Sequence, residues 1–538
     1  MTPSTAEING TWLEGHKSRT QRPLNSEEAA VLIPQITDLA LDWIRAGEAG
    51  APVVQEHTPS ELQHLLQIDF PEGTQDDVAA SRAGTDRVLA SAEAILQNSV
   101  NHWTQGRFAA KLYSSTDAVG IASELLLAFL NANGHVYSAA PALSVIEVAT
   151  VAKINQLIGY GEGSGGLTMP GGSASNRLSL TTAINNLLPS VQHEGMASLP
   201  QQPIVFTSDH SHYSIEQAAI SAGIGLSNVR KVATDHVGRM DIFDLRRQIE
   251  ACLQAGQRPF YINATAGTTV TGCYDDIRQI AALAEQYGCW LHVDGSWGGS
   301  VLWSSKYRSL LDGIHLCSFL LVRDRKLLSA NVVNGDYLFH EGQQYDIGAT
   351  TTFCGRRSDA LKLYLAWQMH GSKGLARMID DALDSGRIIR QRVRENPNLQ
   401  LILPRDENGT SYSVCFRFCP SSQTSVPSDG AQRLTPRQMV RPIHAEVLRR
   451  GHVMVDFAPI KVRVRPPSQP PQAGATTLQP AAVFRASSDR DDIDLSADAD
   501  ENGYIGEVFR LPLHPYGLSA AAEVLDEIVK VGRDLFGA

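Results

Sequence analysis

The sequence predicts an α/β protein with a mainly parallel sheet in a large domain, preceded by a helical segment and followed by a small α+β domain. After Gly165, short apolar runs alternate with amphipathic helical stretches, a pattern typical of a parallel sheet wrapped by helices. Past Gly374 the pattern changes to a helix followed by strands with helices between them. The chain has 538 residues, which is too long for a single hydrophobic core.

Composition and charge favour a folded cytoplasmic enzyme. Hydrophobic residues make up 43% and charged residues 19% of the chain, which is ordinary for a globular protein. The net charge is -11, and no concentrated stripe of Lys and Arg is present, so nucleic acid is not expected as a partner. The first residues lack a basic start followed by an apolar core, and we expect neither secretion nor membrane insertion. The seven cysteines form no CxxC pair and are expected to be reduced.

Residues 1–100 are expected to form an N-terminal helical segment. Asn25 and Glu28 occupy capping-box positions at the start of a helix that extends to Gly47. Its apolar residues fall on one face, which predicts a helix that docks against the rest of the chain: Ile36, Leu39, Ala40, Trp43 and Ile44.

Residues 101–375 are expected to form the large domain. Two apolar helical patterns lie between Asp117 and Ile158, separated by a turn around Gly134. Three apolar runs are predicted to be buried parallel strands, and amphipathic stretches between them are predicted to be helices. The strands are 203–207, 260–265 and 290–294, and the helices are 242–255 and 277–287.

Residues 376–538 are expected to form the small domain, with strands in the runs SYSVCFRFC and HVMVDFAPIKV. Within it, residues 465–502 are rich in Pro, Ala, Ser and Asp and have almost no aromatic or β-branched residues that could fill a core. The sequence therefore predicts a disordered insertion at 465–502.

The first candidate for a ligand site is the run PGGSASN. Gly172 and Ser173 stand just before a predicted helix over 174–188. Glycines let backbone N–H groups approach a phosphate, and the N-terminus of a helix favours its negative charge. A simple tight turn before a helix is the alternative interpretation.

Two histidines follow the predicted strand 203–207, at the end where sheets of this class bind their ligands. His212 is the candidate functional residue, although a lone histidine is more often a satisfied core or surface residue. The pair His210 and His212 also suggests a metal site. Together with His292 and Asp294, these histidines give the less favoured hypothesis of a metal hydrolase. We expect no metal, because no third ligand is obviously placed beside the pair His210 and His212.

Two further strand ends carry polar residues. Thr265, Thr268 and Thr269 follow one strand, where their hydroxyls could bond a ring substituent or cap the next helix. The run WLHVDGSWGGS delivers Asp294 into a tight turn of small residues. A carboxylate in that position can keep a pyridinium nitrogen protonated, which makes the ring an electron sink. A helix N-cap is the alternative role for Asp294.

Together the runs PGGSASN, SDHSHYS, NATAGTTVTG, HVDGSWGG and CGRRSDALKLYLAW resemble the group II pyridoxal-phosphate (PLP) decarboxylases, in order from about Asn101 to Gly374. This family includes glutamate, cysteine-sulfinate, aspartate and aromatic amino-acid decarboxylases. The resemblance implies a fold type I large domain with a seven-stranded type of sheet, PLP as cofactor and a homodimer. The run from Arg107 to Pro141 is similar to the branch that acts on small acidic amino acids.

The resemblance also implies residue roles. Gly172 and Ser173 would hold the cofactor phosphate, and His212 would stack on the cofactor ring as a catalytic residue. Asp294 would pair with the ring nitrogen, and Thr265 would support the site. In the small domain, the run EVFRL is similar to the family's run that carries the arginine for the substrate carboxylate, which nominates Arg510. A second VFR at Arg485 falls in the predicted insertion, so Arg510 is preferred.

The chain departs from the family at the lysine that forms the Schiff base. The family has an Asn-Pro-His-Lys-like motif there and then a Cys-Ser strand, whereas this chain passes directly from GIHL to CSFLLVRDRKLLSANVV. Lys326 lies 326 − 294 = 32 residues after Asp294, close to the family's separation, and is the candidate lysine. The flanking match favours a deletion, so we expect Lys326 to lie outside the pocket. The loop before Cys354 is short, with no tyrosine after Tyr345 to act as proton donor.

Two hypotheses therefore follow from the resemblance. The first is PLP-dependent decarboxylation of a small, acidic amino acid, with the site near the boundary of a homodimer. The second is a catalytically silent relative that keeps the fold, or a coding sequence from which the lysine segment has been lost. Because of the missing lysine motif, we expect little or no decarboxylase activity from the chain as written.

Overall fold

The computed structural model describes residues 25–68, 70, 78–235, 237–317, 326–329, 331, 345–403, 411–420, 434–461, 504–514 and 518–536. The predicted insertion at 465–502 lies outside the described residues, as does the predicted strand beyond Cys317. The described residues confirm an α/β fold with a parallel sheet and a separate antiparallel sheet.

One compact unit comprises residues 1–108 and 445–454, and the other comprises 109–444 and 455–538. In the first, the predicted N-terminal helix is confirmed as α2 (Asn25–Glu48), which packs against α4 (Val78–Gln97). Between them, α3 (Pro59–Leu65) begins with a capping box in which Thr58 and Glu61 satisfy each other's backbone N–H groups. The division at residues 100 and 375 stays a prediction.

The second unit contains a parallel sheet with the strand order β3-β2-β4-β5. Its strands are almost entirely buried, except for the edge strand β3, and this matches their continuous apolar sequences. The three predicted strands are confirmed within one or two residues. The bounds are β2 (Pro203–Ser208), β3 (Val229–Val232), β4 (Arg258–Thr265) and β5 (Trp290–Asp294).

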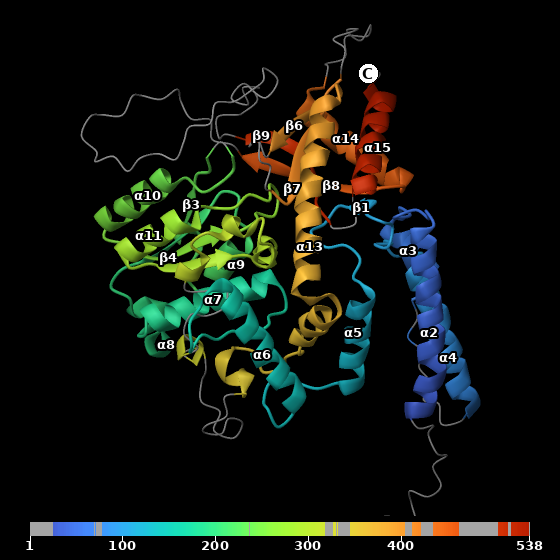
Figure 1. The fold of residues 1–538 in the computed structure, drawn as a ribbon, viewed down its shortest axis with the longest axis horizontal. Coiled ribbons are helices and arrows are strands. Elements are labelled where there is room, and N and C mark those ends of the chain that lie inside the picture. The colour runs from blue at the N-terminus through green and yellow to red at the C-terminus, as the bar shows by residue number, and fades with distance from the viewer. Residues whose placement is uncertain are drawn as a thin grey trace, which may run out of the picture. The chain divides into compact units, whose positions relative to one another are not determined.

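Helices cover both faces of this sheet (Figure 1). On one face, α10 (Ile242–Gln254) and α11 (Ile277–Tyr287) pack on apolar residues of β2, β4 and β5. On the other, α7 (Gly172–Leu187) and α9 (Ser214–Ser221) form a second core with β2 and β4. The short helices of this unit are α8 (Val191–Glu194), α12 (Lys326–Ser329) and the 3₁₀ helices η1 (Met196–Ser198), η2 (Leu226–Asn228), η3 (Gly298–Trp303), η4 (Arg308–Leu311), η5 (Ile314–Leu316) and η6 (Ile347–Thr350).

The two apolar helical patterns before the sheet are confirmed as α5 (Ala118–Leu130) and α6 (Pro141–Ile158). Both pack against α13 (Ala360–Glu395), a long helix interrupted at Gly371, where φ is +64°. The helix expected past Gly374 corresponds to the part of α13 that follows this interruption, and a further helical segment, from Ala360, precedes it. Among the described residues, α6 alone is long and apolar enough to cross a membrane, but its buried Glu147 pairs with Arg356, as in a core helix.

The antiparallel sheet has the strand order β1-β8-β9-β7-β6. The predicted strands are confirmed as β7 (Ser413–Phe418) and β8 (Met454–Lys461). The helix α15 (Leu518–Phe536) packs on β7, where Gly532 leaves room for the ring of Phe418. The remaining elements are β1 (Phe108–Ala109), β6 (Leu399–Leu403), β9 (Tyr504–Pro512) and α14 (Pro436–Arg450).

Candidate active site

The carboxyl ends of three parallel strands meet at one edge of the sheet. β4 ends at Thr265 and β5 ends at Asp294, and these two residues are paired directly in the register. β2 ends at Ser208, four residues before His212. Sheets of this class place their ligands at such an edge, so the topology brings three of the predicted site residues to one place.

Asp294 is buried at this edge, with 8% of its surface exposed. Its Oδ2 accepts a hydrogen bond from Nδ2 of Asn176 at 2.8 Å. Its Oδ1 accepts from the backbone N–H of Ser296 at 3.1 Å and from the Ser296 hydroxyl at 2.6 Å. An ionised carboxylate has about four acceptor positions, so Asp294 keeps capacity for one more donor, such as a ring N–H.

The N-terminus of α7 lies beside this carboxylate. Gly171 precedes the helix with φ at +94°, a conformation that favours glycine. A Cβ atom on Gly172 would lie 2.4 Å from Oγ of Ser296, so only glycine allows the helix to start this close to Asp294. Ser173 follows on the exposed side of the first turn. Because the first backbone N–H groups of a helix have no partner within it, this end can bind a phosphate.

His212 is partly buried after the end of β2. Its Nδ1 lies 2.8 Å from the hydroxyl of Ser214, and the ring of Tyr213 lies 4.2 Å from it between centroids. Burial lowers the pKa of His212 below its ordinary value, and the charge of Asp294 offsets this only in part. His212 is therefore neutral at neutral pH, a form that can stack on an electron-poor ring.

Thr265 is held at the end of β4 by two neighbours. Its hydroxyl lies 3.2 Å from the hydroxyl of Ser211. Its backbone N–H donates to Oδ2 of Asp275 at 2.8 Å. Thr268 does not cap the next helix, whose N-cap is Asp276; its hydroxyl accepts from the N–H of Cys273 at 3.1 Å and so stabilises the turn.

Arg510 lies on β9 of the antiparallel sheet and is buried. Its guanidinium donates to the carbonyls of Thr269 at 3.0 Å and Ala110 at 2.5 Å, and pairs with Asp456 at 3.2 Å. Burial lowers the pKa of Arg510. Its Nε is buried and has no hydrogen-bond partner among the described residues. The rival candidate Arg485 lies outside the described residues.

No lysine side chain in the described part of the chain belongs to the Asp294 site. The sequence has ten lysines, and the side chains of Lys17, Lys326 and Lys461 lie outside the described part. Two others are exposed, and five pair with polar groups other than Asp294. The exposed lysines are Lys373 and Lys530. The paired lysines are Lys111 with Asp456, Lys153 with Gln156, Lys231 with Glu216, Lys306 with Asp384 and Lys362 with Glu124.

The backbone of Lys326 opens α12, which packs against the far end of α7. Nδ2 of Asn186 donates to the carbonyl of Leu327 at 3.0 Å, and Leu328 is fully buried. Asn186 stands ten residues after Asn176 on α7, which is about 15 Å along the helix axis. This placement supports the expectation that Lys326 lies outside the Asp294 site.

A metal centre receives no support from the histidines near the sheet edge. His292 is buried, and its Nε2 lies 2.8 Å from Oδ1 of Asn176, so this nitrogen is engaged in a hydrogen bond. Within the described ranges, no three residues of the types His, Cys, Asp and Glu are grouped as a metal would require.

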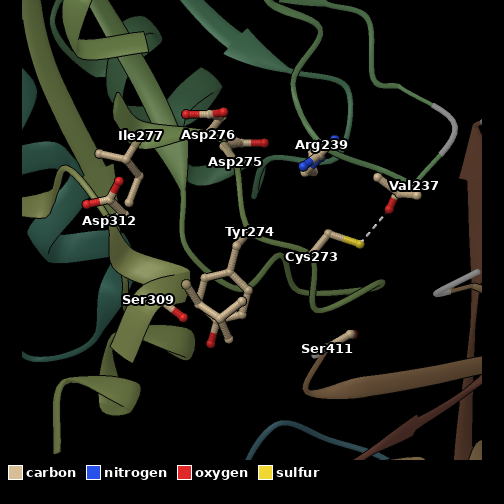
Figure 2. Close-up of a pocket in the computed structure, with 11 residues that line it drawn as sticks. Val237, Arg239, Cys273, Tyr274, Asp275, Asp276, Ile277, Ser309, Asp312 and Ser411 are labelled. Atoms are coloured by element: carbon tan, nitrogen blue, oxygen red, sulfur yellow. Dashed lines mark hydrogen bonds between the residues drawn. The ribbon is translucent and has the colours of Figure 1, made fainter. Parts of the chain in front are cut away.

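A cavity of about 390 Å³ is lined in part by Asp275 and the residues beside it in the chain (Figure 2). Figure 2 shows Asp275, Asp276 and Asp312 on one side of it and Arg239 and Cys273 on the other. None of the residues predicted to bind the cofactor lines this cavity. One of its lining residues, Asp275, also contacts the sheet edge, because its carboxylate accepts a hydrogen bond from the backbone N–H of Thr265 at the end of β4.

Sequence reasoning missed three residues that organise the site. Asn176 and Ser214 are internal to two of the motifs, and Asp275 follows a third. Asn176 stands four residues after Gly172 on α7 and therefore on the same helix face, which is a signal that the sequence does contain. The pair of adjacent acids at Asp275 and Asp276 gave no signal, because either could have been a helix cap.

The residues present fit the ring and phosphate of PLP. Gly172 lets the first turn of α7 pack directly against Ser296, and the backbone N–H groups at this helix start can bind an anion. Asp294 is buried and fixed by three donors, so it can hold a pyridinium N–H. His212 is a neutral aromatic ring at the same edge. The lysine of the family is not represented by a described side chain.

The comparisons agree with this geometry. The family model described as the pyridoxal-dependent decarboxylase conserved domain matches residues 71–419. The L-aspartate decarboxylase dtxS4 of Metarhizium robertsii is 37% identical over 429 residues, which cover 76% of this chain and 82% of that protein.

Solved structures are similar over nearly the whole chain. The crystal structure of mouse CSAD is 26% identical, covers 95% of this chain and 100% of its own, and has a TM-score of 0.78. The structure of Oryza sativa TDC with PLP and tryptamine is 20% identical, covers 96% of this chain and 100% of its own, and has a TM-score of 0.76. The second likeness concerns the fold, which is that of fold type I PLP decarboxylases.

Proposed function

Because this chain belongs to the pyridoxal-dependent decarboxylase family, whose cofactor is PLP, we propose that the Asp294 site serves the decarboxylation of a small acidic L-amino acid. The single observation that carries the proposal is the meeting of Thr265, Asp294, His212 and the start of α7 at one edge of the sheet. The acidic substrate is supported by the 37% identity to an L-aspartate decarboxylase.

Each residue has a defined task in this proposal. Bound PLP supplies an electron sink that lets the bond to the α-carboxylate break with loss of carbon dioxide. Asp294 holds the proton on the ring nitrogen, and Ser296 with Asn176 keeps its carboxylate oriented. His212 covers one face of the ring. The N–H groups around Gly172 and Ser173 bind the phosphate.

Arg510 is proposed to bind a carboxylate of the substrate. Its buried Nε, without a partner among the described residues, is a donor still available for this bond. Asp456 and two carbonyls fix the rest of the guanidinium, which leaves its direction set before the substrate arrives. Tyr345 lies with its ring 5.7 Å from that of Tyr137; we assign it no proton transfer.

The position of α12 favours a second proposal about turnover. No described lysine side chain belongs to the site, and the Lys326 backbone lies at the far end of α7. A family member without this lysine cannot exchange its cofactor bond with the incoming amino acid. As the alternative to an active decarboxylase, we therefore propose that the chain as it stands binds PLP but decarboxylates amino acids slowly or not at all.

The test of both proposals is a PLP-saturated assay of carbon dioxide release from L-aspartate, L-glutamate and L-cysteine sulfinate. Release that is fastest with one of these acids, compared with L-tryptophan, would support the acidic substrate. Tight PLP binding without release would support the silent relative. Failure to bind PLP would contradict both.

We also propose that the protein is a homodimer. The helix α5 exposes a stripe of apolar residues at helical spacing, and such a patch is costly to leave in water. The stripe consists of Ile121, Leu125, Leu126, Phe129 and Leu130. Sedimentation should show a dimer that Phe129→Glu weakens, whereas Phe243→Glu on α10, also exposed, should leave it intact. A monomeric wild type would contradict the proposal.

A cytoplasmic location belongs to the same proposal. Every cysteine that the structure describes is a free thiol, which is typical of a reducing compartment. A fluorescent fusion should be distributed through the cytoplasm, and enrichment in an organelle or outside the cell would contradict this.

A further inference from the structure

The side-chain amide of Asn176 is the centre of a hydrogen-bond network below the sheet edge. Its Nδ2 donates to Oδ2 of Asp294 at 2.8 Å and to Oγ of Ser214 at 2.9 Å. Its Oδ1 lies 2.8 Å from Nε2 of His292. Because a carboxylate only accepts, the amide must turn its NH₂ group toward Asp294, and this fixes the direction of every bond in the network.

The direction of the bond from Asn176 to Ser214 also decides the direction of the bond between Ser214 and His212. Its Oγ accepts from Asn176, so the single hydroxyl hydrogen is free to donate to Nδ1 of His212 at 2.8 Å. The backbone N–H of Ser214 also points at Nδ1, at 3.3 Å. Two donors directed at one nitrogen require that this nitrogen carries no proton.

We propose that Asn176 and Ser214 are positioning residues that hold His212 as a neutral imidazole with its proton on Nε2. Asn176 is 1% exposed and Ser214 is 2% exposed, so water does not compete for these bonds. The same amide donates to Asp294, so one side chain sets both the tautomer of the stacking ring and the orientation of the carboxylate.

The consequence for the cofactor rests on the proposed function. Asp294 keeps the pyridinium positively charged, and a cationic imidazole against its face would place two like charges in contact. A neutral His212 avoids this repulsion and leaves its ring free to stack. Burial, which lowers the pKa of His212, acts in the same direction.

The tautomer is measured directly by the ¹⁵N spectrum of histidine-labelled, cofactor-free protein at neutral pH, with His212→Gln used for assignment. The wild type should show a protonated Nε2 and an unprotonated Nδ1 at His212. Ser214→Ala, which keeps only the backbone N–H donor, should weaken this preference, and Ser214→Thr should restore it through its hydroxyl. Ser221→Ala, on the exposed side of the same helix, should not change it. A proton on Nδ1 in the wild type, or an unchanged signal in Ser214→Ala, would overturn the proposal.

PLP binding by equilibrium dialysis gives the second readout. Ser214→Ala should bind roughly 10-fold more weakly, the loss expected for one hydrogen bond, and Ser214→Thr should bind like the wild type. Equal binding by Ser214→Ala and the wild type would contradict the role proposed for the tautomer. A wild type that binds no PLP would refute the proposed function alone, because the ¹⁵N spectrum tests the tautomer without the cofactor.

Discussion

Asp275 and Thr265 hold each other at the end of β4. The backbone N–H of Asp275 donates to the carbonyl of Thr265 at 2.9 Å, and its carboxylate accepts from the N–H groups of Thr265 at 2.8 Å and Met240 at 2.7 Å. Burial nevertheless raises the pKa of Asp275 to about 6, with Asp235 adding to the rise and Arg239 opposing it. The strand end that supports the site thus depends on a carboxylate that titrates near neutral pH.

This pKa predicts a pH-dependent stability. Asp275 has an ordinary pKa of 3.8 and one of about 6 when folded, so between these values the folded protein binds a proton that the unfolded chain releases. The contribution of Asp275 to the free energy of unfolding should therefore fall by about 2 kcal/mol as the pH rises from 4 to 7. Thermal midpoints across this range should fall relative to those of Asp275→Asn, which cannot ionise.

Asp276→Asn is the matched control, because asparagine caps α11 as well as aspartate does. Its midpoints should run parallel to those of the wild type. Parallel profiles for Asp275→Asn as well would show that Asp275 does not titrate as described.

At the residue scale, the sequence was sufficient to predict which residues lie at the strand ends, but it was insufficient to predict their hydrogen-bond partners. Asp294 and Thr265 follow apolar strands, and the rule that parallel strands place polar ends at one edge located them correctly. Asn176 and Ser214 could not be assigned, because which acceptor an amide or hydroxyl chooses depends on segments far apart in the chain. The role of Lys326 stays a prediction.

At the scale of elements, the start of α7 is the most sensitive part of the site. Gly172→Ala places a Cβ 2.4 Å from Oγ and 2.9 Å from Cβ of Ser296, so Ser296 has to move away from Asp294. Overpacking of this kind costs about 1–3 kcal/mol, and PLP affinity should fall roughly 10-fold or more. Equilibrium dialysis measures this change.

The double variant with Ser296→Gly tests the reason for the loss. Removing the Ser296 side chain removes the clash, so Gly172→Ala should cost much less affinity in that background. An equal loss in both backgrounds would contradict this explanation, because it would mean that the contact with Ser296 is not the cause.

The element α12 makes a separate prediction for Lys326. Because α12 packs on the far end of α7, Lys326→Ala should leave PLP affinity unchanged, and borohydride should fix no PLP to a peptide that contains Lys326. Lys373→Ala on the exposed side of α13 is the control. PLP fixed to Lys326 would place this lysine in the site and restore a fully active decarboxylase.

The boundaries of an element were predictable where one hydrophobic pattern continued through the whole element. β2, β4 and β5 appear within one or two residues of the apolar runs that predicted them. The helix predicted past Gly374 corresponds to the part of α13 after the interruption at Gly371, whereas the helical segment before it, from Ala360, was not predicted. The small-domain insertion at 465–502 lies outside the described residues, and its disorder stays a prediction.

At the scale of the whole molecule, the fold and the residues proposed to bind PLP match the family, whereas the lysine that the family uses for catalysis has no counterpart among the described side chains. The parallel sheet, α7 and the Asp294 network have the arrangement expected for PLP binding, and the family model extends over 71–419. The segment between Cys317 and Tyr345, where the family places its lysine, is also where this sequence departs from it. Cofactor binding and turnover should therefore be separable in this protein.

PLP titration of the purified wild type and of Asp294→Asn tests the central claim most directly. Asparagine keeps the size of the side chain but carries no charge to hold the pyridinium proton, and removal of one partner from a buried charged hydrogen bond costs about 1.5–3 kcal/mol. The account predicts saturable binding of about one PLP per chain to the wild type, and binding weaker by roughly 10-fold or more to Asp294→Asn. Equal affinity of the two proteins for PLP, at equal thermal stability, would contradict the assignment of Asp294 and with it the site described for this chain.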